Sequence, residues 1–213
     1  WNESVAGYKG TSASPRRAYG NAEVYAVAHG LELLSPTPFS DTEAIGVTGA
    51  YANANHLHTL EDLRRVAPTM TLGAPPEFQQ SPTGLAAVEQ AYGFTPAALK
   101  SLDIGAQYQA LDQGTVQAAY VTTTDGQLYN RGYRLLRDPR GVFGVGNAVP
   151  VVSQKVLDAE GPAFKGTIDT VTGLLSTRVI RRLNADVDVY NQVPAVVAKR
   201  FLQANGLIPA SPS

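Results

Sequence analysis

The sequence predicts an α/β fold in which short strands alternate with short helices along most of the chain. Three observations lead to this prediction. Residues 43–48 and 116–122 are apolar runs of strand length, and proline or glycine marks the ends of several amphipathic stretches. The chain has 213 residues, 44% of them hydrophobic, which is enough to bury a sizeable core. We therefore expect a largely parallel sheet covered by helices.

The expected elements follow from these local signals in chain order. Pro15 suits a helix start and Gly30 a helix end, and Thr59 with Asp62 forms an approximate capping box. The expected strands are 31–34, 43–48, 69–74, 99–104, 116–122, 133–137 and 148–152. The expected helices are 15–29, one opening at Thr59, 83–92, 106–112, one from about 155 continuing toward 172, 177–184 and 194–205.

Composition excludes several classes of function. The formal net charge is −1, from 17 basic and 18 acidic residues, and no basic stripe favours a nucleic acid or a membrane surface. The absence of cysteine excludes a disulfide framework, a thiolate metal site and a cysteine nucleophile. No apolar run approaches the ~20 residues of a membrane helix. The chain opens on Trp1 with no signal peptide, so we expect any targeting or anchoring segment to have been removed.

Other constellations give no sign of an enzyme, a metal or a cofactor. His56 and His58 lack a third ligand at useful spacing and are expected in a surface loop. The glycines of 141–146 do not lie between a strand and a helix start, as a dinucleotide-binding loop would. No Gly-x-Ser-x-Gly elbow is present, and Asp103, Asp112 and Asp125 are expected in turns or caps. The sequence therefore predicts a protein that is not an enzyme.

Four ordered stretches carry a resemblance to a known family. The first joins Thr-Leu-Gly-Ala-Pro-Pro-Glu-Phe at 71–78 to Pro-Thr-Gly-Leu at 82–85. The second joins Asp-Ile-Gly at 103–105 to Tyr-Gln-Ala-Leu at 108–111, the third is Thr-Asp-Gly at 124–126, and the fourth runs from Leu-Asn at 183–184 to Gly-Leu-Ile at 206–208. In this order and spacing, from about Tyr8 to Ile208, the chain resembles the substrate-binding proteins of glycine betaine/choline/proline (osmoprotectant) ABC importers.

This resemblance implies a periplasmic-binding-protein-like (type II) fold with two α/β lobes joined by two crossing strands. Residues 1–45 and 148–213 would form the first lobe and residues 46–147 the second. The family normally begins with a further β-α-β unit that this sequence lacks, so the first lobe is expected to be incomplete. A sheet without its central strands leaves edges and apolar faces open, so we expect a partner chain, a second copy, a rearrangement or poor order there.

The resemblance also implies a site in which aromatic rings surround a quaternary ammonium group. Tyr8 matches one ring position of the family, and Thr11 matches a hydroxyl that can bond a carboxylate. The other ring positions fall at Glu43, at about Thr122 and at Gly146, none of them aromatic. Since each ring contributes only about 0.5–2 kcal/mol, losing three should remove most of the affinity for betaine.

The remaining positions point to a changed ligand. Ser81 stands where the family often has an arginine that clamps a carboxylate, so that charge is absent. Glu43 places an acid in the interlobe site, and Thr122, Thr123 and Asn147 would suit hydroxyl groups. The expected ligand is therefore hydroxyl-rich or carries a cationic group that is not quaternary. The alternative is a decayed site in which Glu43 is simply solvated.

Tyr120 offers a substitute ring, because it lies two residues from Thr122 on the same strand face, although a core position is its simpler interpretation. We expect an extracytoplasmic protein that binds a small solute (a quaternary amine, an amino-acid-like molecule or a polyol) and delivers it to ABC permease subunits, without a cofactor. The alternatives are a ligand-sensing regulatory domain of the same fold, a truncated protein without a ligand, and an enzyme for which Glu43 is the one titratable candidate.

Overall fold

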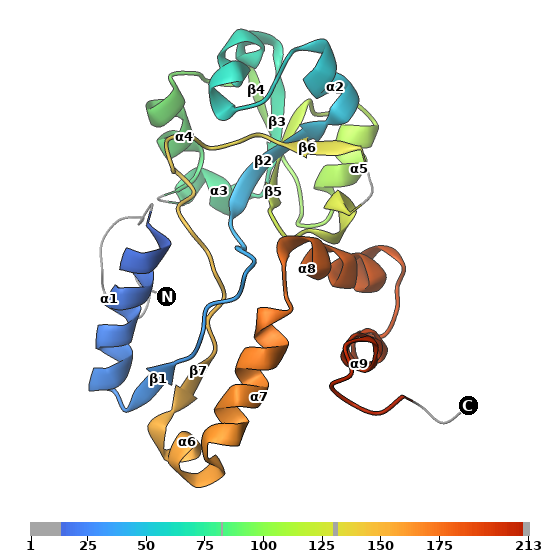
Figure 1. Cartoon of the computed structure of the whole chain (residues 1–213). Coiled ribbons are helices and arrows are strands. Elements are labelled where there is room, and N and C mark those ends of the chain that lie inside the picture. Colours follow the sequence, from blue (N-terminus) through green and yellow to red (C-terminus); the bar gives the residue numbers. More distant parts are fainter. Residues whose placement is uncertain (1–13, 82, 130–131, 211–213) are drawn as a thin grey trace.

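The computed structural model describes residues 14–81, 83–129 and 132–210. The described chain forms two lobes, one above the other in Figure 1, joined by two extended segments that run side by side. The upper lobe holds a five-stranded sheet, and the lower lobe holds a two-stranded one with α1, α6 and α7 beside it. This is the mixed α/β, two-lobe architecture that the sequence predicts.

The two sheets differ in size and in strand direction. Within the described residues the strands are β1 (Leu31–Leu33), β2 (Glu43–Thr48), β3 (Thr71–Ala74), β4 (Ala98–Ser101), β5 (Ala118–Thr122), β6 (Tyr133–Leu135) and β7 (Val151–Ser153). The larger sheet has the order β4-β3-β5-β2-β6, and β1 pairs with β7. β3 is parallel to β4 and to β5, whereas β2 is antiparallel to both β5 and β6. The larger sheet is thus mixed, because β2 alone runs against the other strands, and the parallel pairing expected from the sequence is found only among β3, β4 and β5.

Short helices connect these strands. The α-helices of the described residues are α1 (Pro15–Ala28), α2 (Gly49–Ala54), α3 (Pro76–Gln80), α4 (Leu85–Tyr92), α5 (Gln107–Asp112), α6 (Gln154–Glu160), α7 (Pro162–Gly173), α8 (Thr177–Asn184) and α9 (Pro194–Ala204). The 3-10 helices are η1 (Leu60–Arg65), η2 (Ala67–Thr69) and η3 (Gly126–Leu128), and η4 (Ala185–Val189) is a π-helix.

Two local expectations need correction. The helix expected to continue from about 155 toward 172 is two helices, because Gly161 has φ +75° and Pro162 follows it. A left-handed residue followed by proline ends one helix and starts another. The sequence analysis also missed α2, whose N-cap Thr48 accepts a hydrogen bond from the backbone N–H of Tyr51 at 3.1 Å.

Alternation along β2 and β5 places a separate apolar cluster on each face of the larger sheet. Ile45 of β2 and Ala118 of β5 belong to the first cluster, to which η1, η2, α3 and α4 also contribute. Ala44 and Val121 belong to the second cluster, together with residues of α5. The second lobe therefore has a two-sided core of the kind that supports an independent fold.

The first lobe buries fewer apolar side chains. In α1, Val24 and Val27 are 67% and 69% exposed, and Val151, Val156 and Val193 are also exposed. Within the described residues β1 pairs with β7 alone, and a two-stranded sheet is marginal without further packing. Among the described residues, the first lobe therefore leaves more apolar surface open than the second lobe does.

The two lobes are joined by residues 34–42 and 146–151, which we call the connector segments. Backbone hydrogen bonds pair them, from the N–H of Leu34, Thr37 and Asp41 to the carbonyls of Pro150, Ala148 and Gly146. Their lengths are 2.9, 2.8 and 2.8 Å in that order. The connector is therefore a hydrogen-bonded ribbon through which the chain passes twice.

A second link between the two parts of the chain comes from α8 and η4. The guanidinium Nε of Arg181 donates to the carbonyl of Thr123 at 2.7 Å, and the amide of Asn184 donates to the carbonyl of Thr124 at 2.9 Å. A Cβ at Gly126 would lie 2.5 Å from the backbone nitrogen of Ala185, so only glycine permits this contact. This C-terminal segment is consequently fixed to the turn that follows β5.

We predict that Gly126→Ala destabilises the protein by about 1–3 kcal/mol, because a methyl group would press on the backbone of η4. The measurement is the midpoint of urea unfolding, with amide exchange of α8 as a local readout. Gly166→Ala in α7 is the matched control, since nothing lies within 4 Å of its added Cβ, and it should stabilise by about 0.5–1 kcal/mol. Equal midpoints for the two variants would contradict the prediction.

The capping box expected at Thr59 is confirmed, although it begins a 3-10 helix. The carboxylate of Asp62 accepts from the backbone N–H groups of His58 and Thr59, both at 2.8 Å. These hydrogen bonds, that from His58 first, lower the pKa of Asp62. A lowered folded-state pKa gives stability that is present above the ordinary aspartate value of about 3.9 and is lost as the pH falls through the folded value.

Asp62→Ala should therefore lower the free energy of unfolding by about 0.5–2 kcal/mol at pH 7. The difference between the variant and the unsubstituted protein should shrink as the pH falls below about 4, and should be smallest below the folded-state pKa of Asp62, where the carboxylate is protonated in both states. Urea unfolding at a series of pH values measures it. A difference that stays constant from pH 7 to pH 3 would argue against this role of Asp62.

Candidate ligand-binding site

Glu43 begins β2, at the point where a connector segment enters the larger sheet. Its half-buried carboxylate accepts two hydroxyl hydrogen bonds, from Thr83 at 2.7 Å and from Tyr120 at 3.3 Å. β2 and β5 pair so that Glu43 faces Thr122 and Ile45 faces Tyr120. Tyr120 is thus the diagonal cross-strand neighbour of Glu43 on the same face, within reach of a long side chain.

The turn between α3 and α4 brings Ser81 and Thr83 to the same place. The Ser81 hydroxyl lies 3.0 Å from that of Thr83 and accepts from the backbone N–H of Thr83 at 3.2 Å. Because the single hydroxyl proton of Thr83 goes to Glu43, Ser81 is the donor in their mutual bond. A Cβ at Gly84 would meet the carbonyl oxygen of Phe78, so glycine is required for so tight a turn.

Tyr120 joins this polar group to the core. Its ring packs against Phe78, with centroids 5.0 Å apart and planes at 53°, and Phe78 is only 2% exposed. Burial, followed by the negative charge of Glu43, raises the pKa of Tyr120 to about 12. The phenol therefore stays protonated and donates to Glu43 at ordinary pH. We call Glu43, Ser81, Thr83 and Tyr120 the Glu43 cluster.

Thr122, by contrast, serves the turn that follows β5. Its hydroxyl and its backbone N–H both donate to Asp125. Asp125 also accepts from the hydroxyl of Tyr108 at 2.8 Å, and burial raises the pKa of that tyrosine. Burial in the same region lowers the pKa of Arg181. The hydroxyl proton of Thr122 is therefore already used within the protein. Asp125, the acceptor, lies in a turn, as the sequence predicts.

Thr123 and Asn147 hold the connector segments. The Thr123 hydroxyl donates to the carbonyl of Ser40 at 2.7 Å and accepts from the backbone N–H of Thr42 at 3.0 Å. The side-chain amide of Asn147 donates to the carbonyls of Thr37 and Phe39, both at 3.0 Å. The polar side-chain groups of both residues are therefore bonded to backbone atoms of the connector segment 34–42.

Gly146 lies where the family resemblance places a ring. A Cβ there would be 1.9 Å from the carbonyl oxygen of Asp41, so a side chain cannot enter without parting the connector segments. Two further predicted site residues, Tyr8 and Thr11, fall outside the described residues.

Of the predicted site residues, the structure links Glu43 to Ser81 through Thr83, and Tyr120, considered from sequence as a substitute ring, joins them through its hydroxyl. Thr83 was expected at a helix start and in the Pro-Thr-Gly-Leu motif but not in the site, although its hydroxyl is a principal partner of Glu43. The one local feature that could have indicated Thr83 is its position next to Gly84, where the tight turn before α4 leaves no room for a side chain. The contact itself spans 40 positions of sequence and leaves no local pattern.

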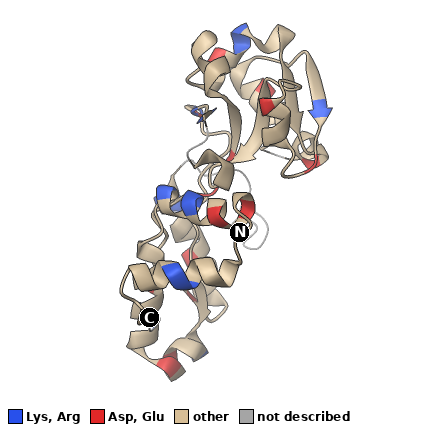
Figure 2. Cartoon of the chain, turned by 90° about the vertical axis from the view of Figure 1, so that its right-hand side faces the viewer, with Lys and Arg blue, Asp and Glu red and all other residues tan. Residues whose placement is uncertain are grey.

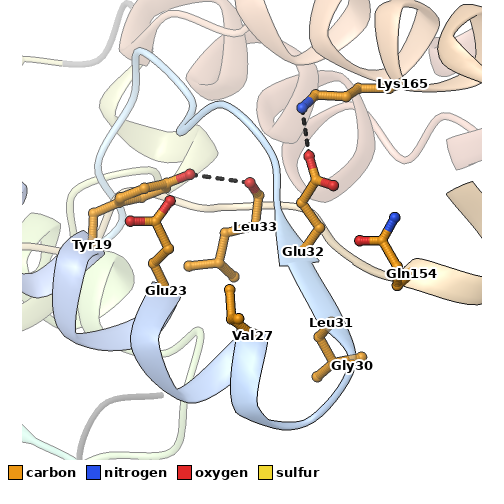
Figure 3. Close-up of a pocket in the computed structure, with 9 residues that line it drawn as sticks. All are labelled: Tyr19, Glu23, Val27, Gly30, Leu31, Glu32, Leu33, Gln154 and Lys165. Atoms are coloured by element: carbon orange, nitrogen blue, oxygen red, sulfur yellow. Dashed lines mark hydrogen bonds and ion pairs between the residues drawn. The ribbon is translucent and has the colours of Figure 1, made fainter.

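A separate cavity of about 540 Å³ lies in the first lobe, where α1, β1, α6 and α7 meet. Figure 3 shows Tyr19, Glu23 and Val27 of α1 along one side of it and Lys165 of α7 on the other. Lys165 pairs with Glu32, which raises the pKa of the lysine, and the Tyr19 hydroxyl donates to the carbonyl of Leu33 at 3.0 Å. None of its lining residues belongs to the Glu43 cluster.

Charge and metal-ligand patterns add no second site in the part of the chain that the structure describes. Figure 2 shows basic and acidic positions spread over both lobes. No group of three or more histidine or acidic side chains is placed to hold a metal ion among residues 14–81, 83–129 and 132–210. His56 has a positive φ of 51° and, like His58, is exposed beside the buried Leu57.

Comparison with known proteins gives curated relatives that are longer than this chain. A glycine-betaine-binding protein of Pseudomonas aeruginosa is 33% identical over 192 residues, covering 85% of this chain and 61% of the relative. The glycine betaine-binding protein YehZ of Escherichia coli is 32% identical over 183 residues, covering 81% and 60%. The chain therefore spans about three fifths of the length of these relatives.

Solved structures give the same result for the fold. A glycine betaine/carnitine/choline ABC transporter structure superimposes with a TM-score of 0.87 at 26% identity, covering 97% of this chain and 76% of the other. Ligand-free YehZ of Escherichia coli superimposes with a TM-score of 0.74 at 30% identity, covering 92% and 73%. The two-lobe, type II binding-protein fold expected from the sequence is thus confirmed.

The family comparison covers nearly all of the sequence. Residues 5–204 match the family described as the substrate binding domain of ABC-type glycine betaine transport systems. The chain therefore belongs to this family, OpuAC.

Proposed function

We propose that the protein is the solute-binding component of an ABC importer and holds a small polar solute at the Glu43 cluster. The observation that carries this proposal is the position of the cluster. It lies at the end of β2, where the paired connector segments enter the second lobe. A ligand there would contact the sheet, the α3–α4 turn and the connector at once, and could favour one relative position of the lobes over another.

The solute is proposed to differ from those of the relatives. Proteins similar to this chain are named for glycine betaine and, in Listeria monocytogenes, for carnitine. Both compounds carry a quaternary ammonium group, which proteins commonly hold against several aromatic ring faces. Here three of the four positions that the family resemblance assigns to rings hold Glu43, Thr122 and Gly146, and the backbone beside Gly146 leaves no room for a ring.

Partners and location are proposed on the same basis. The solute-binding component of such an importer lies outside the cytoplasm and delivers its solute to ABC permease subunits. We propose this location and these partners for the protein. No described helix combines the length and the hydropathy needed to cross a membrane. A protein that no longer binds any solute is a second candidate, because the polar groups of Thr122, Thr123 and Asn147 already have partners within the chain.

A solute screen by thermal shift and isothermal calorimetry tests the proposal. The panel comprises betaine, choline, carnitine, proline, ergothioneine, polyols, sugars and small amines. We expect at least one polar solute to bind, and at about 100-fold excess over its Kd to stabilise the protein by ~2.7 kcal/mol. Small-angle scattering should report a more compact particle with that solute. A panel without any binding solute would favour the second candidate.

A further inference from the structure

We propose that Glu43 selects solutes whose cationic nitrogen carries hydrogen, a primary to tertiary ammonium group, over fully methylated quaternary ammonium. This inference rests on the proposed function and names the class of solute at the same site. It is carried by the contacts of the Glu43 carboxylate, by the packing of the neighbouring ring of Tyr120, and by the hydroxyl groups of Thr122 and Thr123, which already donate within the described part of the chain.

The carboxylate of Glu43 has acceptor capacity to spare. Its two oxygens offer about four lone-pair positions, and each oxygen accepts one hydroxyl, from Thr83 or from Tyr120. The ion pairs of the described residues are Arg140–Glu61 and Lys165–Glu32, so no described cation neutralises Glu43. An N–H group of a bound ammonium could therefore reach a fixed, negatively charged acceptor.

The hydroxyl donors also fix the direction in which the carboxylate acts. Thr83 is held by Ser81 and by the tight turn at Gly84, and the Tyr120 ring is held by the buried Phe78. A pre-oriented acceptor loses little side-chain freedom when a ligand binds. Charge-assisted N–H···O bonds are stronger than neutral ones, whereas a quaternary nitrogen has no N–H to give.

The rings near Glu43 are poorly placed to replace that hydrogen bond. Tyr120 presents its hydroxyl to Glu43 and packs its ring against Phe78. At position 146 a side chain would collide with the carbonyl oxygen of Asp41. A cation–π site needs ring faces around the cation. The described part of the site therefore stabilises the methyl groups of a quaternary ammonium less than it stabilises an N–H donor.

A polyol finds fewer partners here than an ammonium does. The hydroxyls of Thr122 and Thr123 donate to Asp125 and to the carbonyl of Ser40, and the amide of Asn147 donates to two backbone carbonyls. Of the two ligand classes that the sequence leaves open, hydroxyl-rich and cationic, the structure therefore favours the cationic one.

Two methylation series test the inference by calorimetry on the whole protein. One runs from ethanolamine through its N-methyl and N,N-dimethyl derivatives to choline, and the other from glycine through sarcosine and dimethylglycine to betaine. We expect the members that carry N–H to bind, and the last methylation, which removes the final N–H, to weaken binding about 10-fold or more. Equal or tighter binding of choline and betaine would overturn the inference and leave the proposed function intact.

Glu43→Gln separates the charge from the shape of the side chain. It should weaken the N–H members about 10- to 100-fold and abolish the preference within a series. Glu77→Gln, which removes the same charge from an exposed position of α3, should leave every Kd within about twofold. Tyr120→Phe removes one donor but keeps the charge, so it should keep the preference, and it serves as a second variant should Glu43→Gln fail to fold.

The remaining outcomes also decide. A solute of the wider panel that binds equally to the unsubstituted protein and to Glu43→Gln, while neither series binds, would overturn the inference alone. The absence of binding by every solute, in the series and in the panel, would overturn both the inference and the proposed function.

Discussion

The pairing of β2 with β5 is the constraint on which the rest of the structure depends. β2 is the strand by which the chain enters the larger sheet from the connector, and it runs antiparallel to both of its neighbours. Its register sets Glu43 opposite Thr122, and alternation then puts Glu43 on the face shared by Tyr120 and the core of η1, α3 and α4. A slip of one residue would move every side chain of β2 to the opposite face, separating Glu43 from Thr83 and exchanging the two apolar clusters. The register that buries the two apolar clusters is therefore the same register that assembles the site.

The two lobes are stabilised in different ways. In the second lobe apolar clusters cover both faces of a five-stranded sheet, and tyrosines with raised pKa, Tyr92 and Tyr108, donate to Asp138 and Asp125 at its margins. The described part of the first lobe has one strand pair, and the α7 helix beside it has no buried residue. α8 and η4, although they follow the first-lobe helices in sequence, are bonded to the turn after β5. Within the described residues, packing and side-chain hydrogen bonds are thus more extensive in the second lobe, which holds the Glu43 cluster.

Most of the secondary structure was predictable because its signals are local. The capping residues of η1, the proline starts of α1 and α9 and the apolar run of β2 each lie within a few positions of the element they define. The ordered motifs identified the family in the same way.

The site was less predictable, because its contacts join residues far apart in sequence. Thr83 reaches Glu43 across 40 positions, Tyr120 reaches it across 77, and the close approach of Gly146 to Asp41 depends on the connector as a whole. Thr122, Thr123 and Asn147 were identified as polar residues near the site, but sequence could not show that their hydrogen bonds are made within the protein.

This use of polar groups explains why selectivity should depend on so few side chains. The connector needs Thr123 and Asn147 to tie its segments together, and it needs a glycine at 146 so that the segments can approach. Freeing any of these groups for a ligand would leave backbone carbonyls without donors or force the ribbon apart, which would weaken the link between the lobes. The side chain of Glu43 does not take part in these connector contacts, since its partners are the two hydroxyls that orient it. The residue at which the connector enters the sheet can therefore differ in charge without breaking the hydrogen bonds of the connector, and the chemistry of the proposed solute would change with it.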